Sequence, residues 1–170
     1  ADTIASRTKK TISEKMEEDP AFYKKFSALL EEAIKAFREK RITEAQYLTQ
    51  VTDIMESVRN RTGDEIPEVL KNNDAAKAFY GTIAEALKVA EAEPPYGSKN
   101  DLGIIALEID RIIRNRLVVD WIHKPDVMNQ IKNDIDDYLF DLKNKQSLNL
   151  SVDQIDRIME QALDIAKHRY

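Results

Sequence analysis

Apolar residues recur every three or four positions along most of this 170-residue chain. That period matches the 3.6 residues per turn of an α-helix, whereas a half-buried strand alternates every two residues. Only four glycines and five prolines interrupt the chain, too few for a turn-rich all-β protein. The sequence therefore predicts an all-α fold, a bundle of about six to eight helices arranged largely as antiparallel hairpins. The clearest stripe is formed by Phe22, Phe26, Leu29, Leu30, Ala33 and Phe37.

Residue types that favour helix ends indicate where several helices begin and stop. Asp19 precedes Pro20, as an N-cap precedes a proline in the first turn. Thr43–Gln46 and Ser151–Gln154 are capping boxes by spacing, with a hydroxyl at the N-cap and a glutamine three residues later. Gly63 is suited to the left-handed position after a helix. We expect further helices near 66–71, 75–92, 101–116 and 125–142. By contrast, residues 117–122 are rich in β-branched residues, and we expect them to be extended.

The domain organisation follows from one polar stretch and one break. Residues 1–18 are polar with few apolar positions, which predicts a frayed helix or an arm that docks elsewhere. Residues 19–170 predict the helical domain itself. Two adjacent prolines and a glycine interrupt the helical pattern after residue 92. We interpret this 93–100 loop either as a surface loop or as a hinge between two subdomains.

Composition excludes several classes of protein. The chain has no cysteine, which rules out a disulfide, a thiolate nucleophile and a cysteine-based zinc site. No apolar run approaches the ~20 residues of a membrane span, and the polar first ten residues lack the apolar core of a signal peptide. These features predict a cytoplasmic protein without membrane contact. The net charge of −5 argues against a free-standing DNA-binding protein.

One pattern imitates a nuclease. Pro125–Asp126, followed by Asp141–Lys143, resembles the PD…(D/E)xK arrangement, in which two carboxylates hold Mg²⁺. Both parts fall on one predicted helix, whose rise separates the two aspartates by roughly 22 Å. The two histidines lack metal-ligand spacing, and the four glycines are isolated, so no phosphate loop is present. The sequence therefore predicts no catalytic, metal-binding or cofactor-binding residue in this chain.

Three groups of residues are candidates for contacts with partners. The acidic group comprises Asp134, Asp136, Asp137 and Asp141. It indicates a solvated helix face, a docking face for a basic partner or a metal site, although it lacks the glycine and glutamate of a calcium loop. The loop around Pro94, Pro95 and Tyr96 offers rim contacts.

The remaining candidates are basic or aromatic. Arg111, Arg114 and Arg116 form a basic patch that serves ion pairing within the bundle, contact with phosphates or contact with a partner. Trp121 is the single tryptophan, and it is either a core anchor at a helix junction or an interface hot spot.

Several stretches together resemble one family. They are Glu31–Phe37, Ala106–Ile113, Val119–Trp121, Pro125–Ile131 and Ile135–Leu142, and the run Asp-Asp-Tyr-Leu-Phe-Asp-Leu within the last is the most specific. Over roughly residues 28–168 the chain resembles the C-terminal helical domain of the R subunit, the motor and restriction subunit of type I restriction–modification enzymes.

The resemblance implies a non-catalytic tail of an ATP-dependent type I site-specific deoxyribonuclease. In that family the nuclease domain and two helicase-type lobes, which use ATP and Mg²⁺, precede the helical tail. The tail is then expected to pack on its own upstream domains and to tether them to the methyltransferase core, particularly its modification subunit. Contact with DNA is expected through the holoenzyme. The alternative is a DNA-path module, in which the arginines of helix 101–116 together with Lys9 and Lys10 contact duplex phosphates during translocation.

Overall fold

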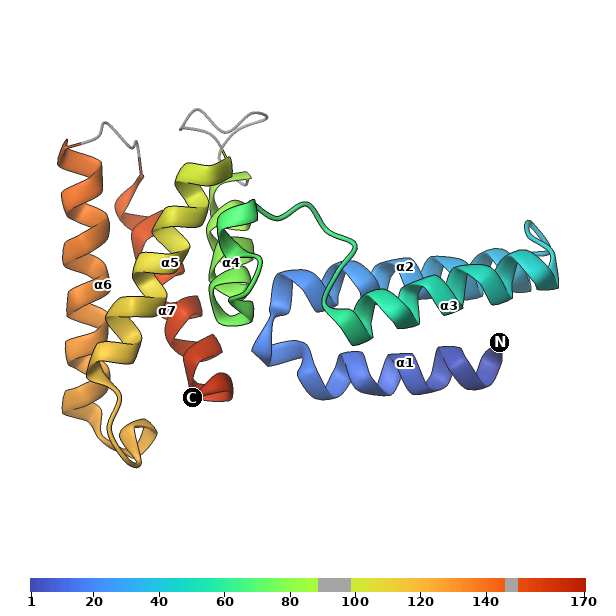
Figure 1. Cartoon of the computed structure of the whole chain (residues 1–170), viewed down its shortest axis with the longest axis horizontal. Coiled ribbons are helices and arrows are strands. Elements are labelled where there is room, and N and C mark those ends of the chain that lie inside the picture. The colour runs from blue at the N-terminus through green and yellow to red at the C-terminus, as the bar shows by residue number, and fades with distance from the viewer. Residues whose placement is uncertain (89–98, 146–149) are drawn as a thin grey trace. The chain divides into compact units, whose positions relative to one another are not determined.

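The chain folds into two separate helical units. The computed structural model describes residues 1–88, 99–145 and 150–170. In these residues it contains seven α-helices, three short 3₁₀ helices and no strand, so the predicted all-α fold is confirmed (Figure 1). Contacts divide the chain into Ala1–Glu65, called unit 1 here, and Ile66–Tyr170, called unit 2.

Unit 1 is a bundle of three helices. They are α1 (Asp2–Lys15), α2 (Pro20–Arg38) and α3 (Glu44–Asn60), with the short η1 (Met16–Glu18) between the first two. Each helix contacts the other two. Residues 1–18 are therefore helical and packed into unit 1, where Ala5, Thr8 and Ile12 are buried. The apolar core of the unit consists of Ala5, Ile12, Phe22, Tyr23, Phe26, Leu30, Ala33, Tyr47, Val51, Ile54 and Val58.

Three predicted helix starts, at Asp19, Thr43 and Ser151, are confirmed. The Asp19 carboxylate accepts a hydrogen bond from the backbone N–H of Phe22, which caps α2. At the start of α3 the hydroxyl of Thr43 accepts from the Gln46 backbone, and the Gln46 side chain accepts from the Thr43 backbone. The same reciprocal pair joins Ser151 and Gln154 at the start of α7. These contacts satisfy backbone donors that have no partner inside a helix.

The end of α3 differs from the prediction. Arg61, not Gly63, adopts the left-handed conformation that closes the helix, with φ 54°. Its guanidinium is held by Asp19 and Asp64, and these ion pairs offset the strain of a non-glycine residue there. Gly63 follows with φ 90°, and a Cβ on it would lie only 2.9 Å from the Ser57 Oγ. Glycine is required at Gly63 for both reasons.

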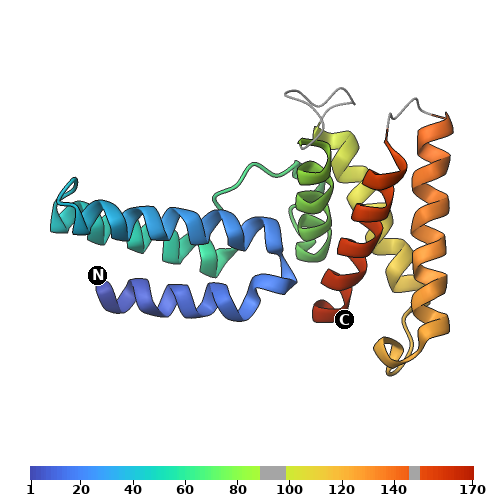
Figure 2. The same cartoon turned by 180° about the vertical axis from the view of Figure 1, so that it is seen from behind.

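Unit 2 is a four-helix bundle. It comprises α4 (Asp74–Lys88), α5 (Lys99–Arg116), α6 (Pro125–Lys145) and α7 (Val152–Arg169). Consecutive helices run antiparallel, and α4 and α6 each contact both α5 and α7 (Figure 1). Seen from the opposite side, α7 lies between α4 and α6 (Figure 2). This is the up-and-down arrangement expected of helices joined by short connections.

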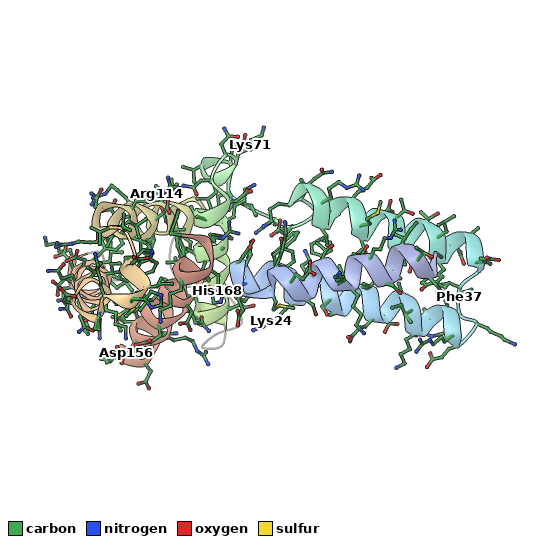
Figure 3. The ribbon with its side chains drawn as sticks, turned by 90° about the horizontal axis from the view of Figure 1, so that it is seen from below. Lys24, Phe37, Lys71, Arg114, Asp156 and His168 are labelled. Atoms are coloured by element: carbon green, nitrogen blue, oxygen red, sulfur yellow. The ribbon has the colours of Figure 1, made fainter. Side chains whose placement is uncertain are left out.

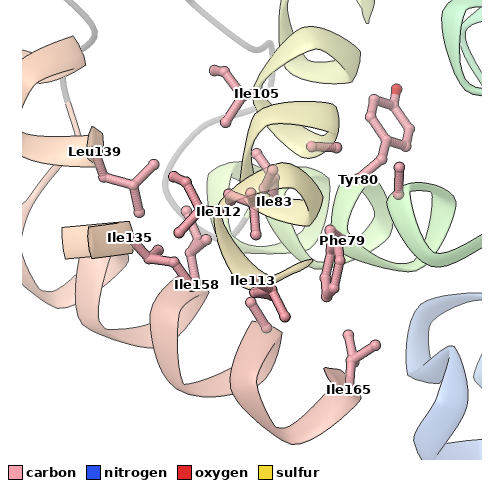
Figure 4. Close-up of a cluster of buried hydrophobic side chains, with 14 of the residues drawn as sticks. Phe79, Tyr80, Ile83, Ile105, Ile112, Ile113, Ile135, Leu139, Ile158 and Ile165 are labelled. Carbon is pink, nitrogen blue, oxygen red and sulfur yellow. The ribbon is translucent and has the colours of Figure 1, made fainter. Parts of the chain in front are cut away.

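All four helices contribute to the core of unit 2. Full burial of each large apolar side chain stabilises the fold by about 1.5–3 kcal/mol relative to exposure. Because these side chains come from all four helices, the unit is held together by one continuous core. Its larger members include Phe79, Ile83, Ile105, Ile112, Ile113, Ile135, Leu139, Ile158 and Ile165 (Figure 4).

Two predicted segments take other forms. The 117–122 stretch is not extended, because Asp120 is left-handed with φ 57° and Trp121–His123 forms the 3₁₀ helix η3. The helix expected over 66–71 is shortened to the 3₁₀ helix η2 (Glu68–Leu70). It packs against α5, where a Cβ on Gly103 would lie 2.9 Å from the Val69 Cγ1. Glycine therefore permits this close approach.

The boundary between the units falls between residues 65 and 66. Most of the 93–100 loop, the boundary considered from the sequence, lies outside the described residues. The helices on either side of that loop, α4 and α5, pack against each other within unit 2. No described helix combines the length and apolar character that crossing a membrane requires.

Candidate functional site

A groove between α5 and α6 gathers residues from two of the predicted groups. It has a volume of about 470 Å³. Two candidate arginines and two candidate aspartates line it, although the sequence placed them in separate groups. We call it the α5–α6 groove, and its lining residues are Glu108, Arg111, Ile112, Asn115, Arg116, Asp134, Asp137 and Tyr138.

An ion pair joins the two walls of the groove. The Arg116 Nε donates to the Asp134 Oδ2 at 2.8 Å, from the end of α5 to α6. Hydrogen bonding to Asp134 raises the pKa of the Arg116 guanidinium. Both side chains remain partly exposed, so solvent screens the pair and its contribution to stability is small.

The other two arginines pair along α5. The Arg111 Nε donates to the Glu108 Oε2 at 2.9 Å, and this hydrogen bond lowers the pKa of the Glu108 carboxyl. The Arg114 Nε lies 2.9 Å from the buried Asp110 carboxylate. All three arginines thus form ion pairs within unit 2, which is the first of the alternatives that the sequence left open. A phosphate would have to compete with a carboxylate at each of them.

The four candidate aspartates do not share one surface. Asp134 and Asp137 line the α5–α6 groove, and Asp141 forms an ion pair with Lys145 at 3.0 Å. Asp136 instead approaches Asp156 of α7. Burial, followed by repulsion from Asp156, raises the pKa of the Asp136 carboxyl. Of the two aspartates that line the groove, Asp137 is the exposed one, and it has no ion pair with any described residue.

The turn after α5 carries an exposed apolar surface. Trp121 is 4% exposed and packs in the core of unit 2, so the indole ring is not itself an exposed contact. Its buried Nε1 has no hydrogen-bond partner among the described residues. Val118, Val119 and Ile122, called the apolar turn here, are exposed around it, Val119 at 82%. The sequence indicated the Trp121 turn as a contact surface but not that its aliphatic neighbours, and not the indole, are exposed, because exposure of β-branched residues is not encoded in their local pattern.

The remaining candidates from the sequence form no site among the described residues. Pro94, Pro95 and Tyr96 lie outside the described residues. Asp126 and Asp141 stand near opposite ends of α6, as the sequence predicted, so the two carboxylates do not converge as the nuclease-like pattern would require. Among the residues that the structure describes, no three His, Cys, Asp or Glu side chains are grouped so as to hold a metal ion.

Two tyrosines of unit 2 should make the protein sensitive to alkali. Burial, and then the Glu108 charge, raise the pKa of Tyr138 to about 12, and burial with the hydrogen bond to Asp110 raises that of Tyr170 to about 12. Folding therefore favours the neutral phenols. Their contribution to stability is complete below the ordinary pKa near 10 and is lost as the pH rises through 12.

Urea denaturation between pH 9 and pH 12 measures this loss. We expect the free energy of unfolding of the wild type to fall more steeply above pH 10 than that of a Tyr138→Phe, Tyr170→Phe double variant. Lysines titrate in both proteins, so the difference isolates the two phenols. Parallel curves would contradict the assignment.

The comparison with known families identifies the chain. The model of a family described as "Type I restriction enzyme HindI endonuclease subunit-like, C-terminal" matches residues 3–168. The chain belongs to this family. The match begins near the start of α1, so this C-terminal domain of a type I restriction endonuclease subunit includes unit 1 as well as unit 2. The resemblance seen from the sequence covered roughly residues 28–168, a shorter part of the chain than the family model matches. No curated protein and no solved structure matches the chain significantly.

Proposed function

We propose that this C-terminal domain is a non-catalytic assembly domain that tethers the motor and nuclease of a type I restriction enzyme to its methyltransferase core. The family membership supports the placement of this domain in a type I restriction enzyme, because the matched family is described as the C-terminal part of an endonuclease subunit. In this proposal the catalytic residues, ATP and Mg²⁺ belong to upstream domains of the parent polypeptide. The partners are those upstream domains and the modification subunit.

The observation that carries the proposal is the apolar turn beside the α5–α6 groove. Val119 is 82% exposed, and Val118 and Ile122 are exposed with it. A surface that combines exposed aliphatic side chains with a charged rim is typical of a protein interface. Arg116, which lines the groove, is separated from Val118 by one residue. In this proposal one partner covers both the apolar turn and the neighbouring end of the groove.

The charges of the groove indicate the chemistry of that partner. Arg111 and Arg116 are already paired with Glu108 and Asp134, whereas Asp137 has no ion pair with any described residue. A partner that carries a cation opposite Asp137 would complete the arrangement. The DNA-path alternative receives less support, because the three arginines that it would use are bound to carboxylates.

Substitution in the apolar turn tests the proposal. We expect Val119→Asp to weaken binding to the cognate methyltransferase core about tenfold, because a carboxylate replaces the most exposed apolar contact. Val152→Asp is the matched control, since Val152 is also exposed but lies at the start of α7. Binding is measured by retention on the immobilised core, with helicity checked by circular dichroism. Equal binding by both variants would remove the turn from the interface.

A second pair of variants tests the groove. We expect Asp137→Lys to slow association with the methyltransferase core, whereas Asp136→Lys, which lies toward α7, should leave it unchanged. The two substitutions make the same change of charge at adjacent positions. Slowing by both to the same degree would indicate long-range attraction rather than contact in the groove. Retention by duplex DNA instead of the methyltransferase would favour the DNA-path alternative.

A further inference from the structure

Unit 1 contains a second pocket, which lies among all three of its helices. Its volume is about 310 Å³, near the lower end of the ~300–1,000 Å³ found for ligand sites. That size suits a single large side chain or a small ring. Figure 3 labels Phe37, which lies in the last turns of α2 and lines this pocket. We call it the unit 1 pocket, and its lining residues are Asp2, Ala5, Ser6, Lys9, Ile34, Phe37, Arg38 and Tyr47.

One part of the pocket is apolar, and contacts between its side chains hold them in place. The rings of Phe37 and Tyr47 stack, with centroids 4.5 Å apart and planes at 10°. The Tyr47 hydroxyl donates to the Asp2 Oδ1 at 3.1 Å, so this ring already has a partner for its polar atom. Ala5 is buried and Ile34 partly buried beside them. This surface offers aromatic and aliphatic contact to an apolar group.

The charged lining of the pocket points to an anionic ligand. Lys9 and Arg38 are exposed and form no ion pair with any described residue. Lys35 of α2 is likewise exposed and has no ion pair with any described residue, so the feature that distinguishes Lys9 and Arg38 is their place in the lining of the pocket. Two uncompensated cations beside an apolar surface favour a ligand with an apolar body and negative charges.

The remaining polar groups favour a peptide over a simple anion. Asp2 lines the pocket with an acceptor carboxylate, and Ser6 adds a hydroxyl. A ligand that presented only negative groups would be repelled by Asp2. A peptide supplies backbone N–H donors for this carboxylate as well as acidic side chains for the cations.

We propose that the unit 1 pocket binds an acidic peptide segment of a partner protein. One aromatic or aliphatic side chain of the segment packs against Phe37 and Tyr47, and its flanking carboxylates face Lys9 and Arg38. This site is separate from the α5–α6 groove, and it uses residues that the proposed tethering surface does not include. The domain thereby offers two surfaces to partners. The apolar turn with the α5–α6 groove presents the unpaired carboxylate of Asp137, and the unit 1 pocket presents the unpaired cations Lys9 and Arg38.

Fluorescence anisotropy with a defined probe tests the site on the whole 170-residue chain. The probe is a fluorescein-labelled peptide with a central phenylalanine flanked by two glutamates on each side. We expect saturable binding that weakens about tenfold when alanine replaces the phenylalanine, and more when lysines replace the glutamates. An absence of saturable binding by the first peptide overturns the proposal. This test needs no methyltransferase, so its outcome is independent of the tethering proposal.

Variants of the protein separate contact in the pocket from general attraction. Lys9→Glu and Arg38→Glu should each weaken binding of the probe about fivefold or more. Lys35→Glu is the matched control, because Lys35 is an exposed cation of α2 that does not line the pocket, and it should change affinity less than about twofold. Ser6→Trp should abolish binding by filling the pocket. Equal effects of Lys35→Glu and Arg38→Glu would mean nonspecific attraction and refute the site.

Circular dichroism of each variant verifies that its helices are intact. A single-stranded oligothymidylate serves as the competing ligand, because bases also stack on aromatic rings and phosphates also meet cations. Failure of the oligonucleotide to displace the peptide is the expected result. Tighter binding of the oligonucleotide, with the same dependence on Lys9 and Arg38, would reassign the pocket to nucleic acid and overturn the peptide proposal.

Discussion

Replacement of Arg61 with alanine is expected to lower the free energy of unfolding of unit 1 by about 3–5 kcal/mol, the cost of leaving a buried charge without its partner. The Asp19 carboxylate is 0% exposed, and the Arg61 Nε donates to it at 2.7 Å. The same guanidinium bonds both carboxylate oxygens of Asp64 at 2.9 Å and lies 3.9 Å from the centre of the Phe22 ring. Without it, the Asp19 carboxylate would remain buried at the start of α2 and would lose its ion pair with the Arg61 guanidinium.

Urea denaturation followed by circular dichroism measures this effect. Trp121 fluorescence, recorded in parallel, reports on unit 2, because the single tryptophan lies in the core of that unit. The main transition in the dichroism signal should move to a lower urea concentration. Arg59→Ala, at an exposed position of the last turn of α3, is the matched control and should change stability by less than about 0.5 kcal/mol.

Two further substitutions at Arg61 distinguish charge from geometry. Arg61→Lys keeps the charge but loses the planar fork, so an intermediate loss is expected. Arg61→Gly relieves the left-handed backbone, which favours glycine by about 1 kcal/mol or more. A glycine variant as stable as the wild type would show that the ion pair adds little, contrary to this account.

Local features of this fold could be predicted from the sequence because their parts are close along the chain. Thr43 with Gln46, and Ser151 with Gln154, lie three residues apart, and both capping boxes form as their spacing indicates. Helical periodicity likewise predicted α2 to α7, since a core-facing stripe must repeat every three or four residues, whereas the sparse apolar positions of residues 1–18 left α1 open as an arm or a helix.

Pairings between helices could not be predicted in this way. Arg61 and Asp19 are 42 residues apart, and the α5–α6 groove depends on the approach of Arg116 to Asp134 across two helices. The sequence indicated both charges of the groove but not that they would meet. The unit 1 pocket was missed altogether, because its residues come from three helices and form no motif. Such sites follow from packing rather than from local pattern.

Asp110 shows how much of unit 2 depends on such a long-range arrangement. Its carboxylate is 4% exposed. It accepts hydrogen bonds from the Asn73 Nδ2 at 2.9 Å and from the Tyr170 hydroxyl, and it lies 2.9 Å from the Arg114 Nε. The Asn73 Oδ1 also accepts from the backbone N–H of Ala76 at the start of α4. One carboxylate thus connects the start of α4, the middle of α5 and the end of α7.

Asp110→Ala is therefore expected to destabilise unit 2 by about 3 kcal/mol, because it leaves a cavity and removes the acceptor shared by three donors. Asp110→Asn keeps the shape and one acceptor, so a loss of about 1–2 kcal/mol is expected. Tyr170→Phe deletes a single donor of the same network and should cost about 1 kcal/mol. Urea denaturation followed by Trp121 fluorescence ranks the three variants. If Asp110→Ala lost no more stability than Tyr170→Phe, the carboxylate would be a neighbour of these donors and not the group that connects the three helices.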